Sequence, residues 1–145
     1  MQETDASEAA CVVVVRGTAA RAVTVRLSNL EPFYDEKTFV VTVQANGLSA
    51  QIEGASVTPW DNPQLDDFFH QLAADYTGWS GSRTWRSNHL AIDAQFQSGG
   101  HVAVTWTLRD GMFAEDRWEV SITTVIEAGE QMTLLAADIG EFLRL

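Results

Sequence analysis

The sequence has very little positive charge. Its 145 residues include nine lysines and arginines against twenty aspartates and glutamates, which gives a net charge of −11, and Lys37 is the only lysine. Binding to a phosphate backbone requires clustered cations, so the composition argues against DNA or RNA as a direct partner. A surface this acidic keeps a protein soluble or attracts a basic protein partner.

Cysteine and long apolar runs are equally scarce. Cys11 is the only cysteine, so the chain can form neither an internal disulfide nor a cysteine cluster for zinc or iron–sulfur. The three histidines, His70, His89 and His101, have no companions at metal-ligand spacing, and we predict no metal and no cofactor. No apolar run approaches the roughly 18 residues of a membrane span, and the acidic N-terminus lacks the order of a signal peptide. We therefore expect a cytoplasmic protein without a membrane partner.

The chain shows the organisation of one folded domain. Its length is typical of a single domain, and no repeat, low-complexity tract or linker divides it. Residues 1–10 are polar and acidic, which predicts a disordered N-terminus. Residues 11–145 are then predicted to form a single α+β domain.

Alternating apolar and polar residues predict several β-strands. The strands are expected over residues 13–15, 23–27, 39–43, 48–52, 90–97, 101–109 and 118–126. The short turn at 98–100 fixes one register, with Leu90 opposite Leu108 and Ile92 opposite Trp106. The same matching of apolar residues, applied to the next strand, places Trp118 opposite Leu108.

Two segments have the periodicity of amphipathic helices. In the first, Asn62 is expected to cap the helix and Pro63 to take its first position, with an apolar stripe from Leu65 to Tyr76. The second begins near residues 129–130 and carries a stripe from 132 to 143. Since each helix is apolar on one side only, the predicted fold is α+β, an antiparallel sheet of about 6–8 strands with both helices packed on one face.

This arrangement leaves the opposite face of the last three strands uncovered. Its residues are small or polar: Ala91, Asp93, Gln95, Ala103, Thr105, Thr107, Arg109, Glu119, Ser121 and Thr123. One interpretation is an ordinary solvated sheet face. The other is a flat platform for a macromolecular partner, because a small ligand would prefer an apolar pocket.

Residues 78–86 combine two tryptophans with two arginines, the residue types that dominate interface energetics. Trp79, Arg83, Trp85 and Arg86 are therefore candidate contact residues, although either indole could instead fill the end of the core. Trp85 is odd-numbered, whereas the buried residues of strand 90–97 are even-numbered. A turn or bulge near residues 87–88 must intervene, and Trp85 could then belong to a short separate strand.

Motifs for catalysis are missing from the sequence. It contains no nucleophile elbow, phosphate-binding loop, dinucleotide fingerprint or HExxH zinc motif. Asp93 and Glu119 share the polar face and could in principle act as paired carboxylates, but two strands separate them. The sequence therefore favours a protein that is not an enzyme.

Several motifs carry a resemblance to a known family. They are Gly78, Trp79, Gly81, Arg83 and Trp85, then residues 99–102, 105–109 and 126–132, and finally Leu135, Ala136 and Asp138. With these motifs the chain resembles, over about residues 11–143, an actinobacterial family defined as a domain of unknown function, number 6228. That resemblance implies no activity. More distantly, the order of elements is similar to WapI-type immunity proteins, which protect cells by binding toxins.

The leading hypothesis is a non-enzymatic protein-interaction module, in its most specific form an immunity-like inhibitor of a basic toxin. The predicted partner-binding residues are Trp79, Arg83, Trp85, Arg86, Asp93, Thr105, Thr107, Arg109 and Glu119. One alternative is a small-molecule-binding protein or hydrolase that uses Asp93, Glu119 and His101. Another is a structural homodimer formed through the polar sheet face or an exposed edge strand.

Overall fold

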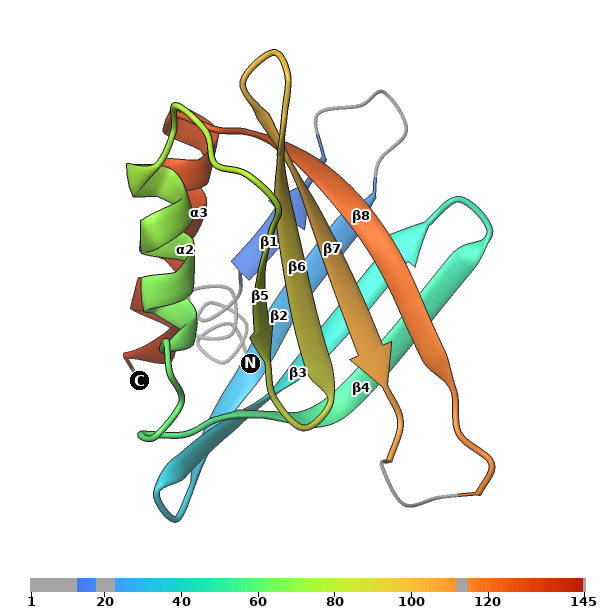
Figure 1. Ribbon diagram of the computed structural model, residues 1–145. Helices are drawn as coiled ribbons and strands as arrows, with labels where there is room; N and C mark the ends of the chain where they lie inside the picture. The colour runs from blue at the N-terminus through green and yellow to red at the C-terminus, as the bar shows by residue number, and fades with distance from the viewer. Residues whose placement is uncertain (1–12, 18–22, 112–114, 145) are drawn as a thin grey trace, which may run out of the picture.

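The computed structural model describes residues 13–17, 23–111 and 115–144 (Figure 1). The predicted disordered segment 1–10 and Cys11 lie outside these residues. The elements follow the order β1 (Val13–Arg16), β2 (Thr24–Phe33), β3 (Glu36–Ala45), β4 (Leu48–Val57), α2 (Leu65–Ala74), β5 (Ser82–Arg86), β6 (Leu90–Gln97), β7 (His101–Arg109), β8 (Glu119–Glu127) and α3 (Glu130–Leu143). The α+β class is therefore confirmed.

The strands form two antiparallel sheets of four strands each, β1-β2-β3-β4 and β5-β6-β7-β8. The prediction of one sheet of 6–8 strands was wrong in this respect. β1 and β8 lie side by side, but no ladder of backbone hydrogen bonds joins them. Alternation of apolar and polar residues along a strand identifies its buried face. It does not identify which other strand lies beside it in the sheet. Strongly twisted strands also favour splitting of a large sheet into two.

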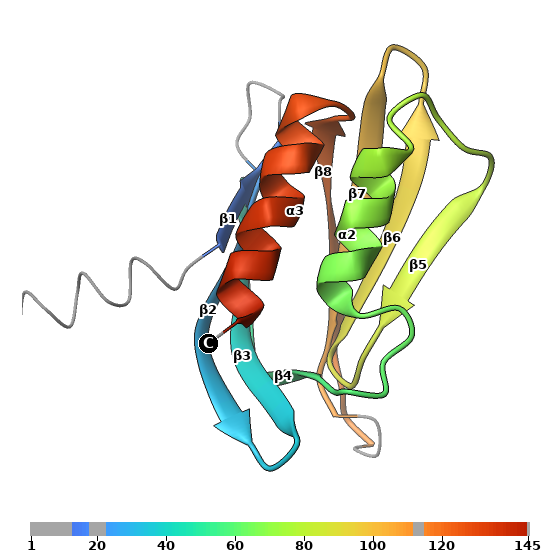
Figure 2. The same cartoon turned by 90° about the vertical axis from the view of Figure 1, so that its left-hand side faces the viewer.

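Both helices lie on the same side of the two sheets and pack against each other. Figure 2 shows α3 on the side of the first sheet and α2 on the side of the second, with β8 between them. The apolar stripe predicted for α3 is confirmed: its buried residues are Met132, Leu135, Ala136, Ile139 and Phe142. The helices therefore cover the inner faces of two sheets rather than one face of a single sheet.

Aromatic side chains connect these layers in one core. Phe69 of α2 stacks on Trp106 of β7 with ring centroids 5.8 Å apart. Phe39 of β3 meets Phe142 of α3 edge to face at the same distance. Burial of each such side chain stabilises the fold by about 1.5–3 kcal/mol, so these contacts hold both sheets to the helix pair.

The start of α2 differs from the prediction. Gln64, not Asn62, occupies the N-cap position, and the helix begins at Leu65. The side-chain amide of Gln64 donates hydrogen bonds to three carbonyl groups of the preceding loop, those of Thr58, Pro59 and Asp61. These bonds organise the loop and delay the helix by two residues. Tyr76, which the sequence placed on the buried stripe, lies beyond the helix end and is exposed.

Of the two predicted registers in the second sheet, one is confirmed. Leu90 pairs with Leu108 and Ile92 with Trp106, as the turn at residues 98–100 predicts. In the β7–β8 pair, Leu108 lies opposite Val120 and not opposite Trp118. A shift of two residues leaves every side chain on its original face, so alternation alone cannot detect it.

Asn88, in the turn between β5 and β6, joins the two sheets. Its Oδ1 accepts hydrogen bonds from the backbone N–H groups of Ser56 (3.1 Å) and His89 (2.8 Å), and its Nδ2 donates to the carbonyl of Gly54 (2.9 Å). The turn predicted near residues 87–88 is thus confirmed, and β5 is the separate short strand that carries Trp85.

Candidate functional site

The second sheet has an outer face that points away from the core and the helices. We define the outer face as the side chains of β5–β8 opposite the buried ones. Six of the nine predicted contact residues come together there: Arg86, Asp93, Thr105, Thr107, Arg109 and Glu119. No element that the structure describes covers this face, which is turned obliquely toward the viewer in Figure 1.

Hydroxyl groups form a ladder across the outer face. The Oγ1 atoms of Thr105 and Thr123 share a hydrogen bond of 2.9 Å. Oγ1 of Thr107 and Oγ of Ser121 share a second one, of 2.7 Å. Each hydroxyl can both donate and accept, so each keeps capacity for a further bond. These short side chains leave the surface flat and rich in hydrogen-bonding groups, which suits a protein partner better than a small molecule.

The outer face ends in a hollow where β7 leads to β8. The hollow has a volume of about 470 Å³ and is lined by Arg109, Asp110, Gly111, Arg117, Trp118 and Glu119. The indole of Trp118 is 39% exposed, and Nε of Arg109 is buried with no hydrogen-bond partner. This end of the sheet therefore combines an accessible aromatic ring with a guanidinium group whose bonding capacity is not fully used.

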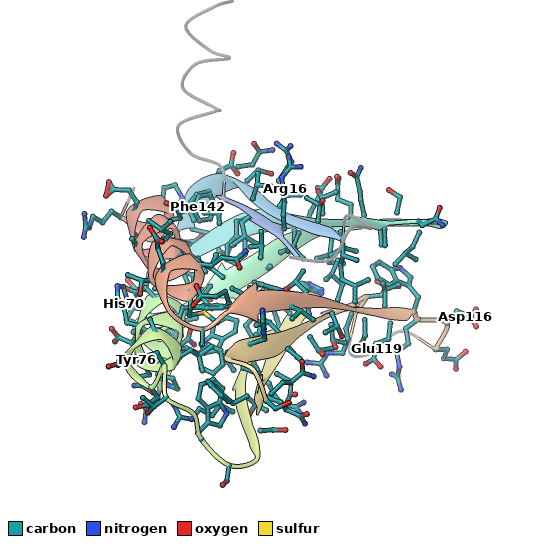
Figure 3. The ribbon with its side chains drawn as sticks, turned by 90° about the horizontal axis from the view of Figure 1, so that it is seen from above. Arg16, His70, Tyr76, Asp116, Glu119 and Phe142 are labelled. Atoms are coloured by element: carbon teal, nitrogen blue, oxygen red, sulfur yellow. The ribbon has the colours of Figure 1, made fainter. Side chains whose placement is uncertain are left out.

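The backbone under this hollow is held in place. The N–H of Arg109 donates to the carbonyl of His89 (3.0 Å), and Nδ1 of His89 lies 2.8 Å from the carbonyl oxygen of Arg109. Seen from above in Figure 3, Glu119 and Asp116 lie at the end of the molecule remote from His70 of α2 and from Tyr76, just beyond the end of that helix. The β7 side of the hollow is therefore anchored to the start of β6, at the end of the molecule opposite the helix layer.

The Trp/Arg segment divides between core and surface. Trp85 is 3% exposed and its Nε1 donates to the carbonyl of Pro63 (3.0 Å), so the interpretation of a core indole holds for it. The guanidinium carbon of Arg83 lies 4.5 Å from the ring centre of Trp79, and its Nη1 pairs with Asp75 at 2.6 Å. Of the four candidate contact residues in this segment, only Arg86 lies on the outer face.

Trp79 is partly buried against Phe96, with ring centroids 5.3 Å apart. Gly78 makes this contact possible, because its φ is +123° and a Cβ there would lie 3.3 Å from the Phe96 ring. Nε1 of Trp79 is buried with no hydrogen-bond partner. The local fold thus uses Trp79, Arg83 and Trp85 for packing, and we do not include them in the surface proposed below.

At the other end of β8, Glu127 has a structural role at the start of α3. Its carboxylate accepts hydrogen bonds from the backbone N–H groups of Gln131 (3.0 Å) and Gly129 (2.7 Å) at the start of α3. These bonds, that of Gln131 first, hold the pKa of Glu127 below its ordinary value. The side chain of Gln131 in turn accepts from the N–H of Glu127 (2.8 Å), so the two residues cap the helix reciprocally.

Sequence reasoning missed the hollow and the role of Trp118. It assigned Trp118 to the buried stripe by alternation with Val120 and Ile122, whereas β8 begins only at Glu119. The acidic residues Glu115 and Asp116 just before this tryptophan were the available signal for a loop end. Among the described residues, no three histidine, cysteine or carboxylate side chains gather as a metal site would require. None of the described helices is long and apolar enough to cross a membrane.

Comparisons with known proteins place the chain in a family. Neither the curated proteins nor the solved structures contain a match to it. A protein-family model matches residues 16–145, which include β2 to α3 in full. The description of that model assigns no activity. The chain belongs to the family of unknown function DUF6228.

Proposed function

We propose that this protein is a non-enzymatic interaction module that binds a basic protein through the outer face of β5–β8. The observation that carries the proposal is the continuity of that face, in which a hydroxyl ladder runs into a hollow with the exposed ring of Trp118. Immunity-like inhibition of a basic toxin is the specific form we favour. Its support is the net charge of −11, together with the resemblance to WapI-type immunity proteins inferred from the sequence.

The features of the face have separate roles in this proposal. Trp118 supplies the aromatic anchor around which interface energy concentrates. The hydroxyl ladder supplies hydrogen bonds that fix the orientation of the partner. The net charge of −11 accelerates encounter with a positively charged protein and has less effect on the final affinity.

The geometry favours binding over paired-carboxylate chemistry. Asp93 pairs with Thr105, which in turn pairs with Thr123 of β8. Glu119 is also on β8, two strands away from Asp93, and precedes Thr123 by four residues. At about 3.4 Å per residue and about 4.8 Å between strands, the two backbone positions are roughly 17 Å apart. Carboxylates that cooperate in glycoside hydrolysis are about 5–9.5 Å apart. His101 lies at the far end of β7 from Arg109, so it does not complete such a site.

Affinity capture with matched variants tests the proposal. Thr105→Arg places a long cation in the middle of the outer face, and Thr42→Arg makes the same change in β3 of the other sheet. We expect the wild type and Thr42→Arg to capture the same basic protein from an extract of the source organism, and Thr105→Arg to lose it. Capture that is equal for all three, or no specific capture by the wild type, would refute the proposal.

A further inference from the structure

A second surface with unusual exposure lies away from the outer face. It carries three aromatic rings: Phe33 (55% exposed), Tyr34 (92%) and Trp60 (69%). Phe33 and Tyr34 belong to the β2–β3 hairpin, and Trp60 to the loop between β4 and α2. Tryptophan and phenylalanine are usually well buried, so a group of exposed rings suggests a contact surface.

The hairpin holds its tyrosine outward at a conformational cost. Phe33 pairs with Glu36, which leaves Tyr34 and Asp35 as the two residues of the turn. Tyr34 has a φ of +56°, in the left-handed region that glycine and asparagine adopt more readily. Its ring contacts Phe33 edge to face with centroids 4.7 Å apart. Since the ring remains 92% exposed, burial in the core does not explain a tyrosine at this position.

The two segments that carry these aromatic residues border one groove. The groove has a volume of about 400 Å³ and lies between the β2–β3 hairpin, the β4–α2 loop and the adjoining ends of the two helices. Asp35, next to Tyr34, lines one side, and Pro59, next to Trp60, lines another. Figure 1 shows the hairpin and the loop at the same lower end of the molecule. We call this feature the aromatic groove.

The aromatic groove is lined by three carboxylates and two cations. Asp35, Asp66 and Asp67 line it, and none of these carboxylates forms an ion pair or side-chain hydrogen bond with another described residue. The two cations of the lining are already engaged: Lys37 donates to the carbonyl of Leu143, and Arg144 pairs with Glu141 at 3.1 Å. The fold itself thus already holds one ammonium group here, at the C-terminal end of α3.

We propose that the aromatic groove binds a protein segment that presents arginine or lysine side chains. The carboxylates attract the cations, and the faces of Tyr34 and Trp60 stack on them. This surface is separate from the outer face of β5–β8, and the inference does not depend on the function proposed for that face.

A labelled hexa-arginine peptide is a suitable probe, with binding measured by fluorescence anisotropy at about 0.15 M salt, where long-range attraction is largely screened. Trp60→Ala and Tyr34→Asn each remove one ring, and asparagine tolerates the backbone of the turn. We expect each to weaken binding about tenfold or more, as the loss of an interface anchor does. Tyr76→Ala removes an equally accessible ring elsewhere and should change affinity less than about twofold.

A second pair of variants separates a site from general attraction by net charge. Asp66→Asn/Asp67→Asn and Glu115→Gln/Asp116→Asn each remove two charges, but only the first pair lies in the groove. Weaker binding of the first double variant alone supports the proposal. Equal losses for both pairs, or unchanged binding of the two aromatic variants, would overturn it. Thr105→Arg should bind the probe as the wild type does, so failure of the outer-face proposal leaves this result unaffected.

Discussion

The two faces of β5–β8 use the same hydroxyl chemistry for different ends. Thr124 points inward and is fully buried, and its Oγ1 accepts a hydrogen bond from Nε1 of Trp106 (3.0 Å). Its neighbour Thr123 points outward and shares a hydrogen bond of 2.9 Å with Thr105. A buried N–H that loses its acceptor carries the full cost of desolvation, whereas an exposed hydroxyl exchanges one partner for water. Burial therefore decides which of the two bonds stabilises the fold.

The comparison explains why the outer face is available for binding. Its ladder contributes little to the free energy of unfolding, so substitutions there should alter recognition and leave the fold intact. The inner face has no such freedom, because its side chains pack against both helices.

Trp106 and Trp118 give the sharpest contrast. Trp106→Ala removes the ring that stacks on Phe69 and should lower the free energy of unfolding by about 3–5 kcal/mol. Trp118→Ala removes a partly exposed ring at the end of the sheet and should cost less than about 1 kcal/mol. Urea denaturation measures both. Equal losses would mean that Trp118 supports the core and is not a free contact residue.

The two adjacent threonines provide a smaller but better-matched test. Thr124→Val keeps the shape of the side chain and leaves Nε1 of Trp106 without its acceptor, so we expect a loss of about 1–3 kcal/mol in the free energy of unfolding. Thr123→Val should change it by less than about 0.5 kcal/mol. If the outward substitution were the more costly of the two, the division of roles between the faces would be wrong.

Glu127 is an exposed residue that nevertheless has a structural role, and it should show the smallest effect. Its pKa is lowered in the folded protein by backbone hydrogen bonds, first from Gln131 and then from Gly129. Its contribution to stability is therefore present above the unfolded-state pKa and is lost as the pH falls through the folded-state pKa. Glu127→Gln should melt below the wild type near about pH 7, and the difference should vanish near about pH 2. A difference that persists in acid would show that the charge is not responsible.

Sequence patterns predicted the local faces of the fold well. The short turn at residues 98–100 predicted the β6–β7 register, and the apolar stripe on α3 predicted the buried side of that helix. The resemblance to domain of unknown function 6228 was also confirmed, by the match over residues 16–145. These features depend on periodicity within one element, or on short segments that a sequence displays directly.

The relations between distant elements could not be predicted in the same way. The split into two sheets depends on sheet twist and on how β1 meets β8, and neither is written in the alternation of one strand. The delayed start of α2 depends on Gln64 reaching back to three loop carbonyls. For the candidate site, the polar residues of the outer face were predicted, whereas the hollow and the aromatic groove are formed by loop ends that carry no periodic signal.

The central claim is that the outer face of β5–β8 is the partner-binding surface. Its most direct test is the affinity of the captured basic protein, measured by calorimetry, for the wild type, Thr105→Arg and Thr42→Arg. We expect Thr105→Arg to bind at least about tenfold more weakly and Thr42→Arg to bind within about twofold of the wild type. Wild-type affinity of Thr105→Arg, or equal weakening of both variants, would contradict the claim.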